Sequence, residues 1–86
     1  MHVTLISPER SVFDGPAESV VAPAFDGLVG ILPHHAPFMT LLGEGVLTVT
    51  HGGGTSAFKV GGGFLQVVGD VVRLVAERAV ESPGLA

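Results

Sequence analysis

Short stretches of alternating hydrophobic and polar residues follow one another along most of the chain. Their spacing is closer to two residues than to the 3.6 residues of a helix turn. Successive side chains of a strand point to opposite faces, so this spacing predicts strands with one buried face. The predicted strands comprise residues 2–7, 10–13, 17–22, 28–32, 38–42, 45–51, 55–60, 64–68 and 71–76.

Turn residues separate these stretches. Asp14-Gly15-Pro16 and Gly52-Gly53-Gly54 each stand between two predicted strands, and glycine allows the positive φ of a tight turn. Gly69-Asp70 is typical of a two-residue hairpin loop. Many short antiparallel strands at close intervals predict an all-β fold, either a sandwich or a barrel.

One stretch near the end differs in composition. Residues Ala76–Glu81 favour a helix, which Pro83-Gly84 would end. A helix of this length is marginal by itself in water, so the composition alone does not establish one. The predicted organisation is one β-domain over residues 1–80 and a short tail over residues 81–86.

Length and composition support a single compact domain. The chain has 86 residues, of which 47% are hydrophobic, with 13 Gly and 6 Pro. A chain this short buries only about 60 to 65% of the surface that its unfolded form exposes. Its stability is then modest unless a partner adds buried area, which favours a role inside a complex.

Charge and targeting signals exclude several classes of partner. The formal net charge is −4 and the four Lys and Arg residues are scattered, so we expect neither nucleic acid nor an anionic membrane surface as a partner. There is no cysteine for a disulfide framework, the start lacks a signal-peptide pattern, and no apolar run approaches the ~20 residues that span a bilayer. We expect a protein that is soluble, cytoplasmic, or held at a membrane only through partners.

Candidate catalytic and metal-binding residues do not have the spacing that such chemistry needs. His34 and His35 are adjacent and point to opposite sides of an extended backbone, and neither His-x-His nor His-x-x-x-His occurs. No serine lies in a Gly-x-Ser-x-Gly pattern. Lys59 precedes Gly61-Gly62-Gly63 instead of closing a phosphate-binding loop. We expect no catalytic residue, no metal and no cofactor.

The segment from Asp26 to Leu42 has a different character. Pro33 and Pro37 each restrict the residue before them to an extended shape, so the middle of the segment is stiff. Stiff loops lose little entropy on docking, which makes this one a candidate binding edge. An ordinary corner of a β-sandwich is an equally good interpretation of the composition.

The same segment resembles a known family. Its run Gly30-Ile31-Leu32-Pro33-His34-His35-Ala36-Pro37 is similar to the Gly-Ile-Leu-Pro-Gly-His-Ala-Pro signature of the epsilon subunit of F-type ATP synthases. The resemblance covers nearly the whole chain, and it is also clear at residues 3–13, 20–23, 61–67 and 71–76. It implies an all-β fold: a two-sheet β-sandwich of about ten short, mostly antiparallel strands.

The resemblance also implies a function. Members of this family are rotor subunits that catalyse nothing and hold no cofactor. They bind the gamma subunit and the c-ring, and they couple proton-driven rotation to ATP synthesis. They lie at the cytoplasmic face of a bacterial membrane and are held there only through the complex.

Matching positions carry the family's contacts onto this chain. The loop that faces the c-ring would comprise Asp26, Gly27, Leu28, Val29 and Gly30. The positions that face gamma would be Ser7, His35 and Thr40, supported by Ala36, Pro37 and Leu41. Two residues depart from the family: Leu28 stands where many relatives have an acid, and His34 stands where relatives have glycine.

Relatives commonly continue past the position of Glu77 into a helical hairpin that inhibits ATP hydrolysis. The resemblance implies a short form without that hairpin, because this sequence ends at Ala86. Fold alone does not determine function, so a stand-alone β-sandwich adaptor or a small-ligand-binding module is the alternative hypothesis.

Overall fold

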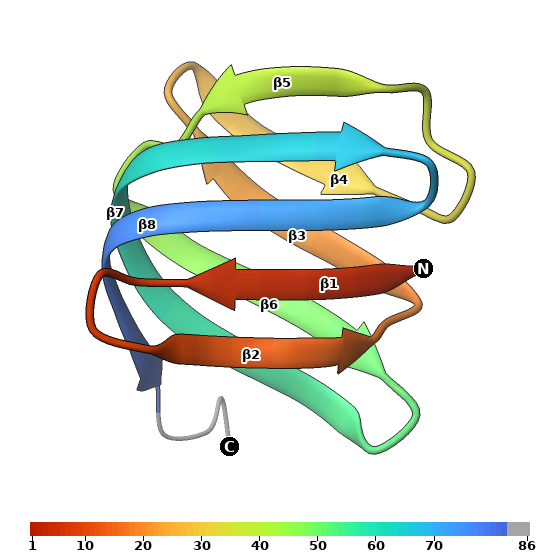
Figure 1. The fold of residues 1–86 in the computed structure, drawn as a ribbon, viewed down its shortest axis with the longest axis horizontal. Coiled ribbons are helices and arrows are strands. Elements are labelled where there is room, and N and C mark those ends of the chain that lie inside the picture. The colour runs from red at the N-terminus through yellow and green to blue at the C-terminus, as the bar shows by residue number, and fades with distance from the viewer. Residues whose placement is uncertain (83–86) are drawn as a thin grey trace.

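The computed structural model describes residues 1–82, and all of its regular elements are strands (Figure 1). The all-β expectation is therefore confirmed. In chain order the strands are β1 (His2–Ile6), β2 (Ser11–Pro16), β3 (Ser19–Ala24), β4 (Gly27–Ile31), β5 (Phe38–Leu41), β6 (Gly45–His51), β7 (Gly54–Val68) and β8 (Val71–Ser82).

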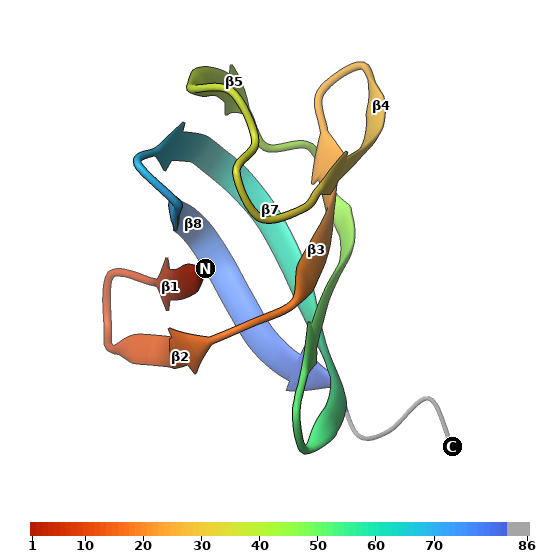
Figure 2. The same ribbon diagram turned by 90° about the vertical axis from the view of Figure 1, so that its right-hand side faces the viewer.

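The strands form two layers that share two long members (Figure 2). β7 has 15 residues and β8 has 12, and both pass from one layer into the other. The first layer has the order β2-β1-β8-β7-β5, and the second has β8-β7-β6-β3-β4. The number of named strands is eight instead of about ten, because β7 and β8 each serve both layers as one continuous strand.

Pairing between the strands is antiparallel except at one position. β1 and β8 run parallel, with His2 opposite Val71 and Ile6 opposite Val75. The first part of β7 pairs with β6, while residues 64–67 pair with β5. The mostly antiparallel sandwich is thus as expected.

Glycines allow the two shared strands to bend together. Gly62 and Gly63 have φ of 71° and 108°, and Gly63 lies opposite Ala76 of β8. A Cβ atom added at Gly63 would lie 1.8 Å from the carbonyl oxygen of Val75. The run Gly61-Gly62-Gly63 therefore allows close backbone approach inside one long strand, whereas the sequence pattern placed it between two separate strands.

Residues 76–81, whose composition favours a helix, continue β8 instead. Ala79 lies opposite Val60, and Glu81 lies opposite Phe58. Pairing along β7 supplies backbone hydrogen-bond partners that outweigh a weak local preference for helix. Glu81 and Ser82 also belong to β8, so the strand runs past the expected end of the domain at residue 80. Residues 83–86 of the expected tail lie outside the described residues.

The core lies between the two layers and is built from alternate residues of each strand. Full burial of one such aliphatic or aromatic side chain contributes about 1.5 to 3 kcal/mol. The largest fully buried side chains are Val3, Leu5, Val20, Ile31, Leu47, Val49, Phe58, Leu65, Val67, Val72 and Leu74. The intervening residues of the same strands face outward, and these outer faces carry the surfaces considered next.

Replacement of Gly63 by alanine should lower the free energy of unfolding by about 3 kcal/mol, because the added methyl group would collide with the backbone of β8. Gly52→Ala is the matched control, since nothing lies within 4 Å of its added Cβ, and its effect should stay within about 0.5 kcal/mol. Urea denaturation of both variants measures the difference. Equal effects would show that the close approach at Gly63 does not limit stability.

Candidate functional site

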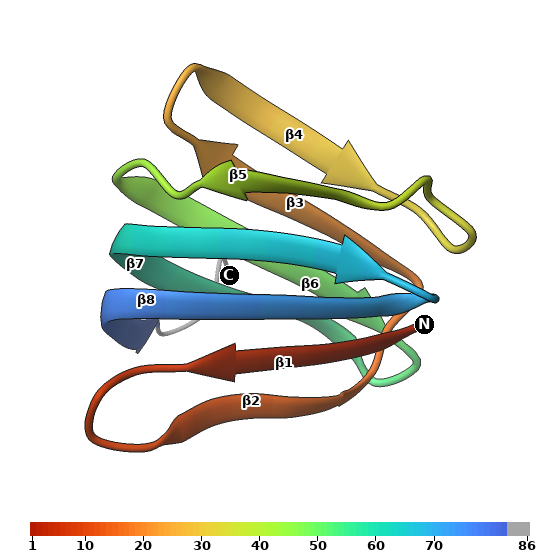
Figure 3. The same cartoon turned by 45° about the horizontal axis from the view of Figure 1, so that its top comes forward.

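The β4–β5 loop carries half of the residues expected to face gamma. It leaves the second layer after Ile31 and enters the first layer at Phe38. Figures 1 and 3 show that it turns beside the hairpin between β7 and β8, near the N-terminus. Elements far apart in the sequence therefore meet at this corner of the sandwich.

A strained turn lies in the middle of this loop. His34 has φ of 66°, in the left-handed region that favours glycine, and it follows Pro33. Proline followed by a residue with positive φ is the pattern of a type II turn. A residue with a Cβ atom adopts this region at a cost of about 1 to 2 kcal/mol. His34 thus adopts, despite its Cβ atom, the conformation that glycine would adopt freely at this position.

Asp70 links this turn to two other parts of the fold. The backbone N–H of His34 donates a hydrogen bond of 3.0 Å to Oδ1 of Asp70. The N–H of His2 donates to the carbonyl oxygen of Asp70 at 3.1 Å. Oδ2 of Asp70 lies 3.7 Å from the amino group of Met1. The hydrogen bond from His34, together with the positive charge of the Met1 amino group, lowers the pKa of the Asp70 carboxyl below its ordinary value.

His35 packs against the start of β5. Its ring centroid lies 4.9 Å from that of Phe38, and the two planes are tilted by 46°. Nδ1 of His35 lies 2.7 Å from the carbonyl oxygen of Ala36 and donates a hydrogen bond when it carries the proton. Ala36 and Pro37 are exposed beside this ring, so residues 35–37 form one small surface.

The two candidate residues of β5 face different ways. Thr40 lies opposite the buried Leu65 and is itself half-buried, so its side chain points toward the core side of the layer. Leu41 lies opposite Phe64 on the outer side and is 61% exposed, and Met39 is exposed to a similar degree. Of the two expected contacts on β5, only Leu41 presents its side chain outward.

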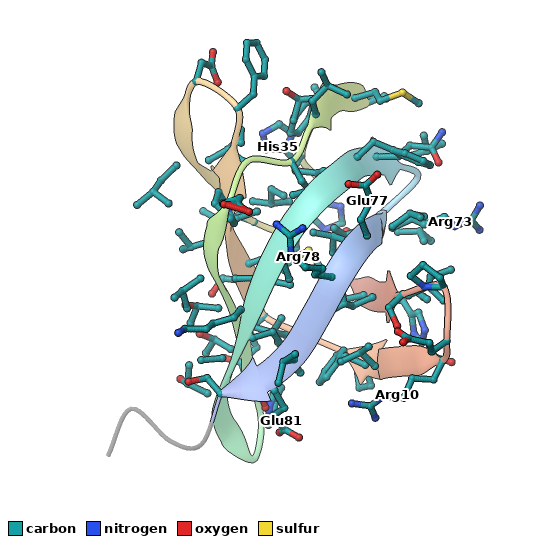
Figure 4. All side chains as sticks on the ribbon, turned by 90° about the vertical axis from the view of Figure 1, so that its left-hand side faces the viewer. Arg10, His35, Arg73, Glu77, Arg78 and Glu81 are labelled. Carbon is teal, nitrogen blue, oxygen red and sulfur yellow. The ribbon has the colours of Figure 1, made fainter. Side chains whose placement is uncertain are left out.

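Leu41 begins an apolar row across the outer face of the first layer. Register pairs connect Leu41 to Phe64, Phe64 to Val75, and Val75 to Ile6. We call these four side chains the outer row. The neighbouring row is more polar and includes Arg73, which points away from the sandwich (Figure 4). Phe64, Val75 and Ile6 were not among the predicted contact residues, although their alternation with buried neighbours marks them as outward-facing.

Ser7 lies apart from the His35 loop, next to the far end of the outer row. It follows Ile6 and closes the turn between β1 and β2 through two backbone hydrogen bonds with Arg10, of 2.9 and 3.3 Å. Its hydroxyl oxygen lies 3.3 Å from the carbonyl oxygen of Arg10, to which it donates, and the residue is only 9% exposed. The structure therefore places Ser7 and Leu41 at opposite ends of one surface.

The residues expected to face the c-ring form the hairpin between β3 and β4. Ala24 pairs with Gly27, and Phe25 and Asp26 occupy the turn. Gly27 has φ of 134°, which glycine adopts without strain. Asp26, Gly27 and Gly30 are exposed, whereas Val29 is half-buried and packs against the core.

Two large apolar side chains lie close to Asp26 in the sequence of this hairpin. Leu28 is 74% exposed and Phe25 is 66% exposed. Phe25 was not among the expected contacts, because the family signature does not draw attention to that position. The hairpin tip is therefore more apolar than the sequence analysis indicated.

Elsewhere on the surface of the described residues, few polar side chains lie close together. Residues 1–82 contain no group of three or more His, Asp or Glu side chains that could hold a metal ion. A shallow groove of about 330 Å³ on the second layer lies along Val46, Lys59 and Val80, beside the ion pair of Glu44 with Arg78. Across this described part of the chain, no helix is long and apolar enough to cross a membrane.

The fold and the site define a small β-sandwich. It has a proline-restricted loop at one corner and the outer row of apolar side chains on its first layer. Its family is clear from comparison with known proteins. The chain belongs to the family described as ATP synthase, Delta/Epsilon chain, beta-sandwich domain, which matches residues 1–82. The resemblance drawn from the sequence is thus confirmed.

Curated relatives carry the name ATP synthase epsilon chain. The chain is 44% identical over 82 residues to that of Caulobacter vibrioides, covering 95% of this chain and 95% of the relative. It is 39% identical over 80 residues to that of Maricaulis maris and 43% identical over 79 residues to that of a Synechococcus strain. These two matches cover 93% and 92% of this chain, but only 60% and 58% of the relatives.

Solved structures share the fold. A chain in the mitochondrial ATP synthase of Euglena gracilis, in a structure of OSCP, F1 and c-ring, matches with a TM-score of 0.85 and 26% identity. That match covers 92% of this chain and 51% of the Euglena chain. A chain in the central stalk and c-ring structure of Tetrahymena thermophila matches with a TM-score of 0.78 at 19% identity, covering 93% and 65% of the two chains.

The lowered pKa of Asp70 makes a prediction about acid stability. A carboxyl whose pKa is lower in the folded state stabilises the fold above about pH 4, and this contribution disappears as the pH falls through the folded pKa. Wild type should therefore lose more stability than Asp70→Asn when the pH is lowered from 7 to about 2. Urea denaturation at both pH values tests this. A wild-type advantage that grows on acidification would contradict it.

Proposed function

We propose that this protein is a non-catalytic rotor subunit of an F-type ATP synthase. It binds the gamma subunit through the first layer and the c-ring through the β3–β4 hairpin, and it couples proton-driven rotation to ATP synthesis. Family membership combined with the outer row carries the proposal. The names of the relatives, and the F1, c-ring and central-stalk assemblies that contain the similar folds, support it.

The outer face of the first layer suits a protein partner. The outer row crosses four strands from Leu41 to Ile6, and Met39 adds a further exposed apolar side chain beside it. Leu41 is exposed, whereas Phe64, Val75 and Ile6 are half-buried. A contiguous apolar surface that is partly open to solvent is typical of an interaction site. Gamma would cover this surface between β5 and the Ser7 turn.

The His35 loop adds a second contact at the corner of the same layer. Pro33 and Pro37 restrict its backbone, so docking costs little conformational entropy. His35 and Pro37 would present edge and ring surface to gamma, while Thr40 supports them from the inner side of β5. The side chains that meet gamma most directly are then Leu41, His35 and Pro37.

The β3–β4 hairpin provides a contact of different chemistry. Asp26 supplies one carboxylate at the tip, and Phe25 and Leu28 supply apolar area on either side. Such a tip would dock between ring loops that offer both a polar group and an apolar surface. Since Leu28 replaces the acid of many relatives, Asp26 takes the anionic role.

Shared strands give the sandwich a direct mechanical connection between these contacts. The gamma surface lies on the first layer and the hairpin on the second, and β7 and β8 run through both without interruption. Torque between the partners would therefore pass along paired backbone. The protein would lie at the cytoplasmic face of a bacterial membrane, held there by the complex, without nucleic acid, metal or cofactor.

Replacement of Leu41 by glutamate tests the gamma surface. It should weaken binding to the gamma subunit of the same organism about tenfold or more, because it places a charge in an apolar contact. Val80→Glu is the matched control: Val80 is 63% exposed, close to the value for Leu41, but faces outward from the second layer. Calorimetry with purified gamma measures both, and thermal unfolding shows that both variants fold. Equal affinities for the two variants would place the surface elsewhere.

Replacement of Asp26 by lysine tests the ring contact. It should weaken association of the gamma complex with membranes that contain the c-ring by about two- to fivefold, as expected for an exposed charge at an interface. Glu18→Lys is the control, an exposed acid at the opposite end of β3. Sedimentation with these membranes at low and high salt measures the effect. A loss that is the same for Glu18→Lys would reflect net charge instead of the hairpin.

A further inference from the structure

We propose that Asp70 is a positioning residue for the gamma-binding loop. Its carboxylate holds His34 in the left-handed conformation and so fixes His35 against Phe38. The inference rests on the proposed function, because it assigns to Asp70 the order of the loop that gamma would bind. Asp70 itself needs no contact with gamma.

The loop depends on this carboxylate more than on any other hydrogen-bonding group. Among the hydrogen bonds of residues 1–82, the bond of 3.0 Å from His34 N–H to Asp70 is the only one that joins residues 32–37 to another part of the chain. The other hydrogen bond of the loop, from the His35 ring to Ala36, is local. Prolines at positions 33 and 37 limit the loop but do not select the sign of φ at His34.

Asp70 is well suited to hold a neighbour in place. It lies in a two-residue hairpin closed by the pair Val68 and Val71. Gly69 and Asp70 both have positive φ, 56° and 64°, as a type I′ turn requires. Aspartate tolerates this region better than most residues. The backbone of Asp70 is also tied to β1 through His2, and its Oδ2 lies 3.7 Å from the amino group of Met1, which restrains the carboxylate.

The conformations of His34 and Asp70 are therefore coupled across 36 positions of sequence. Without the carboxylate, no hydrogen bond among the described residues would hold His34 in its strained conformation. His35 would then spend less time packed against Phe38. If the loop is competent to bind for about a tenth of the time, the apparent Kd for gamma rises about tenfold.

Asp70→Gly and Asp70→Asn separate the carboxylate from the turn. Glycine keeps the positive φ and removes the side chain, whereas asparagine tolerates the turn and keeps an acceptor oxygen in the same place. We expect D70G to weaken gamma binding about tenfold and D70N to weaken it less than about threefold. The His34 amide should exchange with solvent faster in D70G than in wild type.

His34→Gly provides a second and independent test. Glycine needs no help to adopt positive φ, so the loss of the carboxylate should matter less in this background. The effect of D70G on gamma affinity should fall from about tenfold to less than about threefold when His34→Gly is present. A merely structural role of Asp70 in the hairpin would give the same loss in both backgrounds.

The outcomes distinguish this inference from the proposed function. If wild type binds gamma and D70G binds equally well, or if D70G has the same effect with and without His34→Gly, the positioning role is wrong and the proposed function stands. If wild type does not bind gamma, the proposed function is wrong, and amide exchange at His34 decides the positioning role alone. Asp70→Ser, whose side chain is shorter, replaces D70G if that variant does not fold.

Discussion

The close approach of β7 and β8 at their glycines is the constraint on which the rest of the structure depends. Only glycine at position 63 allows the backbone of β7 to lie against the carbonyl oxygen of Val75. Because both strands bend there together, one pair of strands contributes to both layers. The core between the layers and the outer face that carries the outer row follow from this bend.

In the loop at the corner of the sandwich, a hydrogen bond offsets strain in the backbone. His34 accepts a conformation that glycine would adopt freely, and a carboxylate from another hairpin compensates for part of the strain. Local strain of this kind persists where surrounding structure determines it. Here the surrounding structure is the hairpin turn between β7 and β8. The residues next to the pair that closes this turn are fully buried.

Several features could be predicted from the sequence because their causes are local. Alternation placed Val3 and Leu5 on one buried face, and Gly69-Asp70 marked a hairpin that the structure contains. Family resemblance rested on the run from Gly30 to Pro37, and the match over residues 1–82 confirms it.

Other features depend on contacts between distant residues. Residues 76–81 have the composition of a helix, but their partners on β7 lie about twenty residues away and decide the strand. The bond between His34 and Asp70 joins two loops that no local pattern relates. His34 therefore stands out in the sequence as a departure from glycine, whereas the group that stabilises it does not.

The parallel pair of β1 and β8 has a consequence for how the chain comes to be folded. Residues 2–6 pair on one side with residues 11–16 and on the other with residues 71–75, near the opposite end of the described chain. Closing so long a loop costs more conformational entropy than closing a local hairpin, so β1 is expected to pair first with β2. During synthesis the first layer stays incomplete until residues 71–75 have left the ribosome, so the apolar residues of β1 lack this neighbour while all the strands in between are made.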